Sequence, residues 1–233
     1  MSDPDDSTPK TWQQTKSENT RTAILNAAID CFYRLGYANT TTENIAQAAG
    51  LSRGAMLHHF ANRFELIKAS IEHLTAQRLE TYVREGEAAQ RSDPTQTDID
   101  DGIDVYWQQL NTPAFIVFHE LLIASRTDPE LREALMPAHA RFRDAVFASS
   151  KRVFPDLARS EAFLRANILT RYLLEGMALA RINETGPLPT DHMLDWLKAT
   201  LKAEFSDVLP AARTAAHTQP PYEHTHSEPD RDG

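Results

Sequence analysis

Apolar residues recur at three- and four-residue steps along most of the chain, and this spacing constrains the fold more than any other feature. The pattern runs through residues 18–209 of the 233-residue sequence, and its period is that of an amphipathic α-helix. No run of strand length alternates between apolar and polar residues. The sequence therefore predicts an all-α fold with enough length to bury a sizeable core.

The two ends of the sequence lack this apolar period. Residues 1–17 and 210–233 are polar and contain several prolines, a composition that buries too little apolar surface to become ordered. We predict a disordered arm and a disordered tail at these ends. Between them we expect an N-terminal domain of residues 18–63, followed by a larger helical-bundle domain of residues 64–209.

Capping residues, glycine and proline mark the limits of the expected helices. Thr41 or Thr42 can cap the second helix and Ser52 the third, while Gly50 ends the second. Pro137 should kink or split the seventh helix, because proline lacks the backbone N–H. The expected helices span about residues 20–35, 42–49, 53–60, 62–88, 100–110, 113–126, 129–154, 158–181 and 190–209.

Residues 42–60 have the spacing of a helix-turn-helix. Gly50 can adopt the left-handed backbone conformation that the turn needs, and the small Ala46 lets the two helices cross closely. Such a motif reads DNA when its second helix exposes hydrogen-bond donors at the N-terminal end, which enters the major groove. That end carries Arg53, Gly54 and Ala55. The alternative is a plain helical hairpin inside a larger bundle.

The charge balance points to an anionic partner for the first third of the chain. The whole chain has a formal net charge of −9. Residues 10–63 hold six Lys and Arg residues against three Asp and Glu residues, which gives +3 and leaves −12 for the remainder. This asymmetry favours nucleic-acid binding by the N-terminal domain only.

Apolar helix positions, turn glycines and capping hydroxyls combine between residues 21 and 67 in Arg21 to Ala28, Phe32, Leu35 to Tyr37, Thr41, Thr42, Ile45, Ala46, Ala49 to Ser52, Gly54, His59, Phe60, Arg63 and Leu66. In this set the chain resembles the DNA-binding domain of the TetR/AcrR (tetracycline-repressor) family. The rest of the chain resembles the family only in length and in its succession of helices. The resemblance implies a homodimeric transcription regulator, usually a repressor, whose C-terminal domain binds a small-molecule effector and dimerises through its last two long helices.

The resemblance also implies which residues contact a double-stranded, roughly palindromic DNA operator. Thr42 would hold a phosphate at the start of the second helix. The bases would face Arg53, Gly54 and Ala55, and the phosphate backbone would lie against His58, His59 and Arg63. The family usually has a tyrosine where this chain has Leu57, so that phosphate contact is absent here or is replaced by a neighbour such as His58.

Aromatic and long apolar side chains in the larger domain could enclose a small ligand. Ligand sites are mostly apolar and carry a few polar groups. The candidates are Trp107, Phe115, Phe118, His119, Leu122, Phe142 and Met177. His119 could instead be a hydrogen-bonded core histidine, and each of the others could be ordinary core.

The last two expected helices carry apolar stripes that could serve two packing faces. One stripe joins Leu194, Leu197, Leu201, Phe205 and Val208. The other joins Leu169, Tyr172, Leu173, Gly176 and Ala180. One face would pack within the chain and the other would pair across a two-fold axis as a four-helix bundle. On this interpretation a charge at Leu201 should give monomers or insoluble protein.

The sequence offers no positive evidence for catalysis, a metal site or a cofactor. His119-Glu120 begins like a zinc-protease motif, but Ile123 stands where the second histidine would be needed. The tail lacks a fixed cage of metal ligands around His217, His224 and His226. We therefore expect a regulator and not an enzyme. The alternatives are a DNA-binding architectural protein without an effector and a helical enzyme that has acquired a helix-turn-helix.

Membrane insertion and secretion are not expected. No stretch approaches the ~18 uncharged apolar residues of a membrane span, and the N-terminal residues lack the basic and apolar segments of a signal peptide. The single cysteine, Cys31, cannot form an internal disulfide, which agrees with a reducing compartment. We expect a cytoplasmic protein in which Cys31 is a small buried apolar residue.

Overall fold

The computed structural model describes residues 11–92, 99–155, 157–183 and 189–206. These ranges contain helices and connecting turns but no strand, which confirms the predicted all-α fold. The elements are α1 (Trp12–Leu35), α2 (Thr42–Ala48), α3 (Arg53–Leu57), α4 (Arg63–Ser92), α5 (Ile99–Leu110), α6 (Pro113–Ala124), α7 (Pro129–Val153), the short 3-10 helix η1 (Leu157–Arg159), α8 (Glu161–Asn183) and α9 (Thr190–Glu204).

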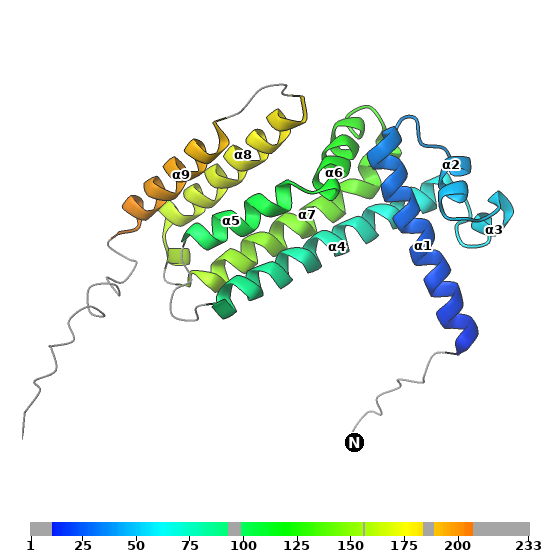
Figure 1. The fold of residues 1–233 in the computed structure, drawn as a ribbon, viewed down its shortest axis with the longest axis horizontal. Coiled ribbons are helices and arrows are strands. Elements are labelled where there is room, and N and C mark those ends of the chain that lie inside the picture. Colours follow the sequence, from blue (N-terminus) through cyan, green and yellow to red (C-terminus); the bar gives the residue numbers. More distant parts are fainter. Residues whose placement is uncertain (1–10, 93–98, 156, 184–188, 207–233) are drawn as a thin grey trace, which may run out of the picture.

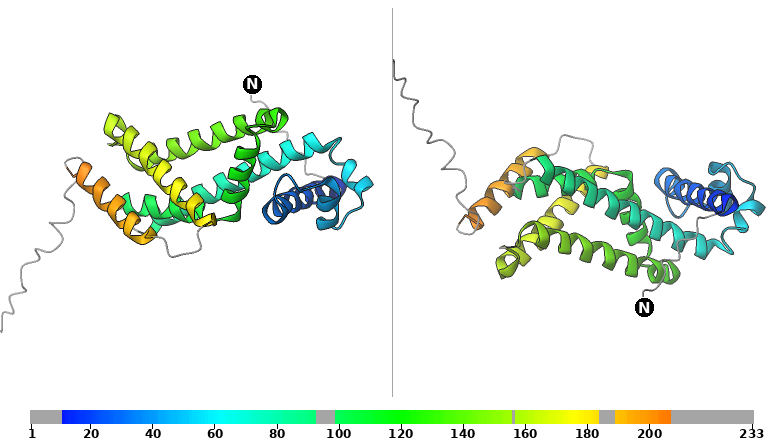
Figure 2. Two further views of the ribbon diagram at one scale, coloured as in Figure 1. Left: turned by 90° about the horizontal axis from the view of Figure 1, so that it is seen from above. Right: turned by 90° about the horizontal axis from the view of Figure 1, so that it is seen from below.

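The long helix α4 connects the two ends of the molecule. Its first turns lie beside α1, and the rest of it packs along α7 and α5 (Figure 1). Both views in Figure 2 show α4 leading from the group of α1, α2 and α3 into the body, with α8 and α9 at the opposite end. The helix-turn-helix therefore stands at one end of an elongated helical body.

The interior forms two apolar clusters. The first runs without interruption from the small N-terminal helices into the body, because Ile24 and Phe32 of α1 share it with Ile71 of α4 and Leu121 of α6. Cys31 belongs to this cluster and is buried, and burial raises the pKa of its thiol. The second cluster joins α5, α8 and α9.

The first helix begins earlier than its apolar pattern predicts. We expected a disordered arm up to residue 17, but α1 starts at Trp12. Thr11 caps it by accepting a hydrogen bond from the Gln14 backbone N–H at 3.3 Å, while the Gln14 side chain accepts one from the Thr11 N–H at 2.8 Å. This capping box stabilises an exposed turn that has no apolar face. Residues 1–10 and the predicted tail, with its histidines, lie outside the described residues.

The seventh helix is continuous through Pro137. The sequence allowed either a kink or a split, and the structure excludes the split, since α7 runs from Pro129 to Val153. Leu135 and Ala138, on either side of the proline, are fully buried in the first cluster. Packing of this face therefore holds the helix together despite the missing hydrogen bond.

The two apolar stripes of the last helices have different environments. Leu194, Leu197 and Phe205 are buried inside the chain and Leu201 is half-buried beside them, while Val208 lies outside the described residues. The exposed face is on α8, where Leu169 is 66% and Tyr172 60% exposed. Because Leu201 packs within its own chain, a charge there would disturb the core as well as any interface, so Leu201 alone does not test dimer formation.

Candidate DNA-binding surface

The turn between α2 and α3 is built as the sequence predicts. Gly50 has φ +69°, and no atom lies within 4 Å of the place where a Cβ would stand, so the backbone conformation and not a lack of space requires glycine. The Leu51 N–H donates to the Ala46 carbonyl at 2.9 Å and closes the turn. Ser52 caps α3 by accepting a hydrogen bond from the Ala55 N–H at 3.1 Å.

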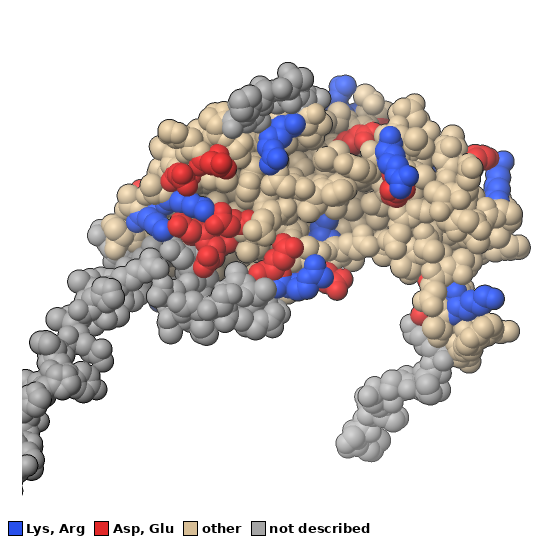
Figure 3. All heavy atoms as spheres, viewed as in Figure 1, with Lys and Arg blue, Asp and Glu red and all other residues tan. Residues whose placement is uncertain are grey.

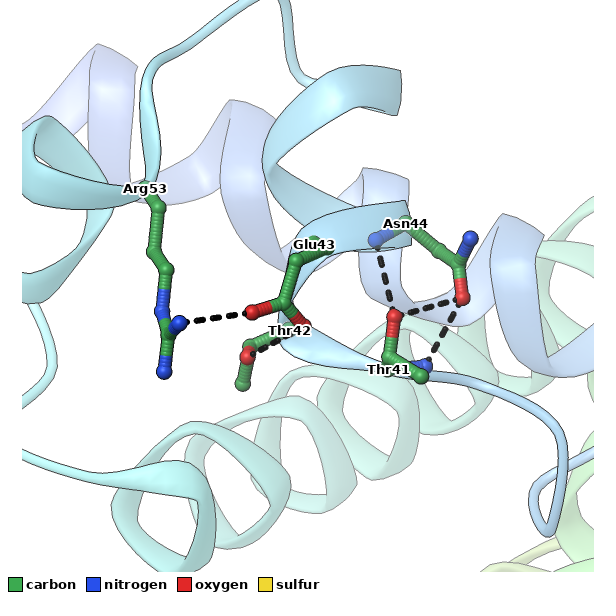
Figure 4. Close-up of polar contacts among 5 residues, drawn as sticks. All are labelled: Thr41, Thr42, Glu43, Asn44 and Arg53. Atoms are coloured by element: carbon green, nitrogen blue, oxygen red, sulfur yellow. Dashed lines mark hydrogen bonds and ion pairs between the residues drawn. The ribbon is translucent and has the colours of Figure 1, made fainter.

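Thr41, and not Thr42, caps the second helix. The Thr41 hydroxyl oxygen accepts a hydrogen bond from the Asn44 N–H at 3.1 Å, and the Asn44 side chain accepts one from the Thr41 N–H at 3.0 Å (Figure 4). Thr42 is the first residue inside the helix, and its hydroxyl donates to Glu43 at 3.1 Å. A phosphate bound by Thr42 would have to replace or share this hydrogen bond.

The predicted base-contacting residues lie at the start of α3 on the molecular surface. Arg53 and Gly54 are exposed and Ala55 is half-buried. Leu57, which stands in place of the family's tyrosine, is 44% exposed, and the neighbouring His58 is exposed while His59 is half-buried. These side chains can therefore be reached by a large partner.

An ion pair that sequence reasoning missed joins the two helices of the motif. Arg53 Nη1 lies 2.9 Å from Glu43 Oε1, so the guanidinium reaches back to the first turn of α2 (Figure 4). The pKa of Glu43 is lowered, chiefly by the hydrogen bond from its own backbone N–H and also by Thr42 and Arg53. Arg53 must therefore loosen or give up its ion pair with Glu43 before two of its N–H groups can bind one guanine.

Two further arginines hold the motif to its supporting helices. Arg63 Nη1 donates to the Thr40 carbonyl at 2.7 Å, and the Arg63 guanidinium carbon lies 5.6 Å from the Tyr37 ring centroid. These contacts tie the loop before α2 to the start of α4. Arg21 donates to the His59 carbonyl at 3.1 Å and ties the end of α3 to α1. Because a guanidinium has five N–H donors, Arg63 keeps donors for a phosphate.

On the body of the molecule, acidic and basic side chains lie side by side. On the face shown in Figure 3, acidic groups gather over α5 and α9 together with basic ones. Lys198 lies 2.6 Å from Asp104, and Lys202 lies 2.5 Å from Asp100. Asp100 and Asp104 are thus paired within the body and lie far from the helix-turn-helix.

The body contains a cavity of about 460 Å³ that some of the predicted ligand-binding residues line. It lies between α4, α5, α6, α7 and α8, and its walls include Phe118, His119, Leu122 and Phe142. A smaller cavity of about 140 Å³ lies towards α9. It is lined by Tyr82, Phe163 and Leu201 among others and by none of the predicted residues.

Three predicted ligand-binding residues lie outside the lining of the larger cavity. Phe115 is fully buried in the core, Trp107 is half-buried with Arg181 against its ring, and Met177 packs on the second cluster. The sequence left open whether His119 contacts a ligand or is a hydrogen-bonded core histidine, and its position in the structure fits both interpretations. It is buried, donates from Nδ1 to the Phe115 carbonyl at 3.0 Å, and also lines the cavity. Its pKa is lowered, chiefly by burial.

A helix-turn-helix with exposed donors, mounted on an elongated helical body, defines a DNA-binding regulatory protein. Residues 24–70 match the family model for bacterial regulatory proteins of the tetR family. An uncharacterized HTH-type transcriptional regulator of Mycobacterium tuberculosis is 24% identical over 196 residues, which cover 82% of this chain and 97% of that protein. The HTH-type transcriptional regulator CymR of Pseudomonas putida is 30% identical over 135 residues, 58% of this chain and 64% of CymR.

The fold of the whole chain agrees with this match. The crystal structure of the multidrug binding protein EbrR in complex with imidazole has a TM-score of 0.54 at 22% identity, over 83% of this chain and 97% of EbrR. Residues 24–70 are therefore similar to the DNA-binding domain of tetR-family regulatory proteins, and the longer matches are to HTH-type transcriptional regulators. Proteins of this family are non-enzymatic, in agreement with the sequence analysis. Among the described helices, none is both long and apolar enough to cross a membrane.

Arg53→Ala should weaken operator binding by about 1–3 kcal/mol and relax the preference at one base position, because it would remove the predicted bidentate hydrogen bonds to a base edge. Arg63→Ala should weaken binding to all sequences alike. Binding-site selection from random duplexes, followed by titration of the selected site, measures both effects.

Glu43→Gln complements Arg53→Ala, since it keeps the Arg53 side chain and removes only the negative charge with which Arg53 pairs. It should bind unrelated DNA more tightly than the wild type does. The same base preference for wild type and Arg53→Ala would contradict the assignment of Arg53 as a base-contacting residue.

Proposed function

We propose that this protein is a homodimeric repressor of the cytoplasm that leaves a roughly palindromic operator when a small molecule enters the cavity of about 460 Å³. One observation carries the proposal. Both α4 and α6 contact the helix-turn-helix end of the chain, and both line this cavity. A ligand that moves either helix therefore acts on the DNA-binding end.

The first connection is α4. Its first residue, Arg63, binds the Thr40 carbonyl just before α2, and Arg78 of the same helix lines the cavity. At ~1.5 Å per residue these positions lie about 22 Å apart along the axis. A continuous helix transmits rotation and translation over this distance, so α4 can serve as a lever.

The second connection runs through α6, and its contact with the end of α1 was not predicted from the sequence. Phe118 and His119 face the cavity, and the adjacent Glu120 accepts a hydrogen bond from the Tyr37 backbone N–H at 2.6 Å. Gly36 has φ +79°, and a Cβ there would come within 2.8 Å of Glu120 Oε1. The end of α1 is therefore in close contact with the helix that forms one wall of the cavity.

We assign DNA binding to the domain of residues 18–63 and ligand binding and dimerisation to residues 64–209. Within the first domain, the proposed contacts are Thr42, Arg53, Gly54, Ala55, His58, His59 and Arg63. Their support is that they surround α2 and α3 at the surface. Within the second, we retain Phe118, His119, Leu122 and Phe142 as ligand contacts, supported by their position on the cavity wall.

Two observations support an effector. A volume of about 460 Å³ lies within the range of small-molecule sites. EbrR, which shares the fold at low identity, is a multidrug binding protein described in complex with imidazole.

The proposed dimer interface is the exposed apolar face of the last two helices. On α8 it includes Leu169, Tyr172 and Gly176, and on α9 it includes Trp196, which is 55% exposed. Nothing lies within 4 Å of a Cβ placed on Gly176, so a second helix could approach this position closely. Two such helix pairs related by a two-fold axis would form a four-helix bundle.

Leu169→Glu should convert the dimer to monomers while leaving the helical content unchanged, because it places a charge in the proposed interface and not in the core. Sedimentation or light scattering together with circular dichroism measures this. Leu201→Glu is the control and should lower the melting temperature, because Leu201 packs within its own chain. A folded dimer from Leu169→Glu would contradict the proposed interface.

The function is tested by titrating the selected operator with and without ligands found by thermal-shift screening. An effector should weaken DNA binding, and DNA should weaken effector binding by the same factor, since binding free energies are linked. A typical coupling is about 1–3 kcal/mol.

Glu120→Gln should still bind DNA and effector but should show a smaller coupling, because it weakens the hydrogen bond between α6 and Tyr37. Glu130→Gln, on the exposed first turn of α7, is the matched control. Ligands that bind tightly and leave DNA affinity unchanged would contradict the proposed repressor.

A further inference from the structure

A positively charged side chain is buried in the wall of the cavity. Arg78 of α4 is only 9% exposed. Its guanidinium carbon lies 4.3 Å from the ring centroid of Phe118 and 4.1 Å from that of Phe142, so it contacts aromatic rings of both α6 and α7. Burial lowers the pKa of Arg78 to about 10, which leaves it charged at neutral pH. A buried charge is costly unless a counter-charge or hydrogen bonds compensate it.

The protein supplies only part of that compensation. Arg78 Nη1 is buried and has no hydrogen-bond partner among the described residues. The acid whose charge acts on it is Glu175 of α8, but the Glu175 carboxylate accepts a hydrogen bond from the Tyr106 hydroxyl at 2.9 Å. Within the described part of the chain, no carboxylate comes close enough to Arg78 to form an ion pair. Its Nη1 donor remains for another acceptor.

A second polar atom on the same cavity wall lacks a partner. His139 of α7 lines the cavity, and its Nδ1 is buried without a hydrogen bond to any described residue. Its ring centroid lies 5.2 Å from that of Phe118, the ring that Arg78 also contacts. The guanidinium and the imidazole are therefore both next to one aromatic ring. Buried polar atoms without a hydrogen-bond partner are rare in native proteins, and two in one cavity indicate a missing partner.

We propose that the cavity binds an apolar monocarboxylic acid, whose carboxylate pairs with Arg78 and His139 and whose body lies against Phe118, Leu122 and Phe142. The inference rests on the proposed function, since this molecule would be the effector. A carboxylate matches the planar fork of a guanidinium. The remaining walls are largely apolar and would hold an aromatic or aliphatic body.

The charges around the cavity favour an acid over an amine. Its lining residues include Arg78, Arg143 and Arg171 against Asp144 and Glu175. Asp144 lies 3.0 Å from Arg143, and Glu175 accepts from Tyr106, so both acids already have partners. An ammonium group placed near Arg78 would be repelled. A dianionic phosphate needs more donors than the two buried unpartnered groups provide.

Three probes with the same ring system test the proposal: 2-naphthoate, 2-naphthol and 2-naphthylmethylamine, which carry a carboxylate, a neutral hydroxyl and an ammonium group at neutral pH. Calorimetric titration of the full chain without DNA should show that naphthoate binds about tenfold or more tightly than naphthol, since a hydrogen bond to a charged group is stronger than one to a neutral group. Naphthylmethylamine should bind more weakly than naphthol, because its ammonium group is repelled by Arg78. Equal binding of the three probes, or no binding of naphthoate up to its solubility, would overturn the proposal.

Arg78→Met assigns the effect to the guanidinium, because methionine can fill the space between the two rings. The variant should bind naphthoate and naphthol alike and keep or raise the melting temperature, as expected when an uncompensated buried charge is removed. Arg78→Lys, which keeps the charge, should retain part of the preference for the acid and provides a second variant. Arg143→Met, at the exposed rim, is the matched control and should keep the full preference. An unchanged preference in Arg78→Met would overturn the proposal.

These measurements involve no DNA, so their failure is separate from that of the proposed function. Naphthoate that binds through Arg78 but leaves operator affinity unchanged would preserve the anion site and contradict the repressor mechanism.

Discussion

The apolar packing of α4 against both ends of the molecule is the interaction on which the rest of the structure depends. Leu66 and Ile71 of α4 share one core with Ile24 of α1 and Leu135 of α7. Because protein interiors are close-packed, such a helix moves as a rigid body and carries its neighbours with it. The helix-turn-helix is therefore attached to the body by a continuous core and not by a flexible linker.

Polar contacts also connect the loop between α1 and α2 to three helices of the body. The loop between α1 and α2 binds α6 through Glu120, α4 through Arg63, and α7 through the Tyr37 hydroxyl, which donates to Asp128 at 2.9 Å. Asp128 also caps α7 by accepting a hydrogen bond from the Leu131 N–H. Three walls of the cavity thus end on one loop that leads directly into α2. A change in the relative positions of these helices changes the position of the DNA-binding motif.

Local signals predicted the helices and most of the caps, because periodicity and capping depend on residues close in sequence. Thr11 and Gln14 also carried such a signal, but α1 there has no apolar face to draw attention to it. Contacts between distant segments could not be predicted in this way. Arg78 lies in a polar stretch of α4 that looks solvent-exposed, but it is buried against the rings of Phe118 and Phe142 from two other helices. Likewise, the rotation of α9 about its axis decides that Leu201 faces inward.

The cavity and the proposed dimer interface meet on α8. The rim of the cavity is formed by three exposed residues of α8 that also line it, Leu164, Ile168 and Tyr172. Leu169, in the proposed interface, directly follows Ile168 on this helix. A partner subunit packed on α8 would therefore lie next to the cavity opening. Because recognition helices in a dimer must match half-sites about one DNA turn apart, a small shift of α8 in the proposed dimer would affect both the cavity and the spacing of the two DNA-binding motifs. Ligand entry, dimer geometry and DNA binding then depend on the same helix.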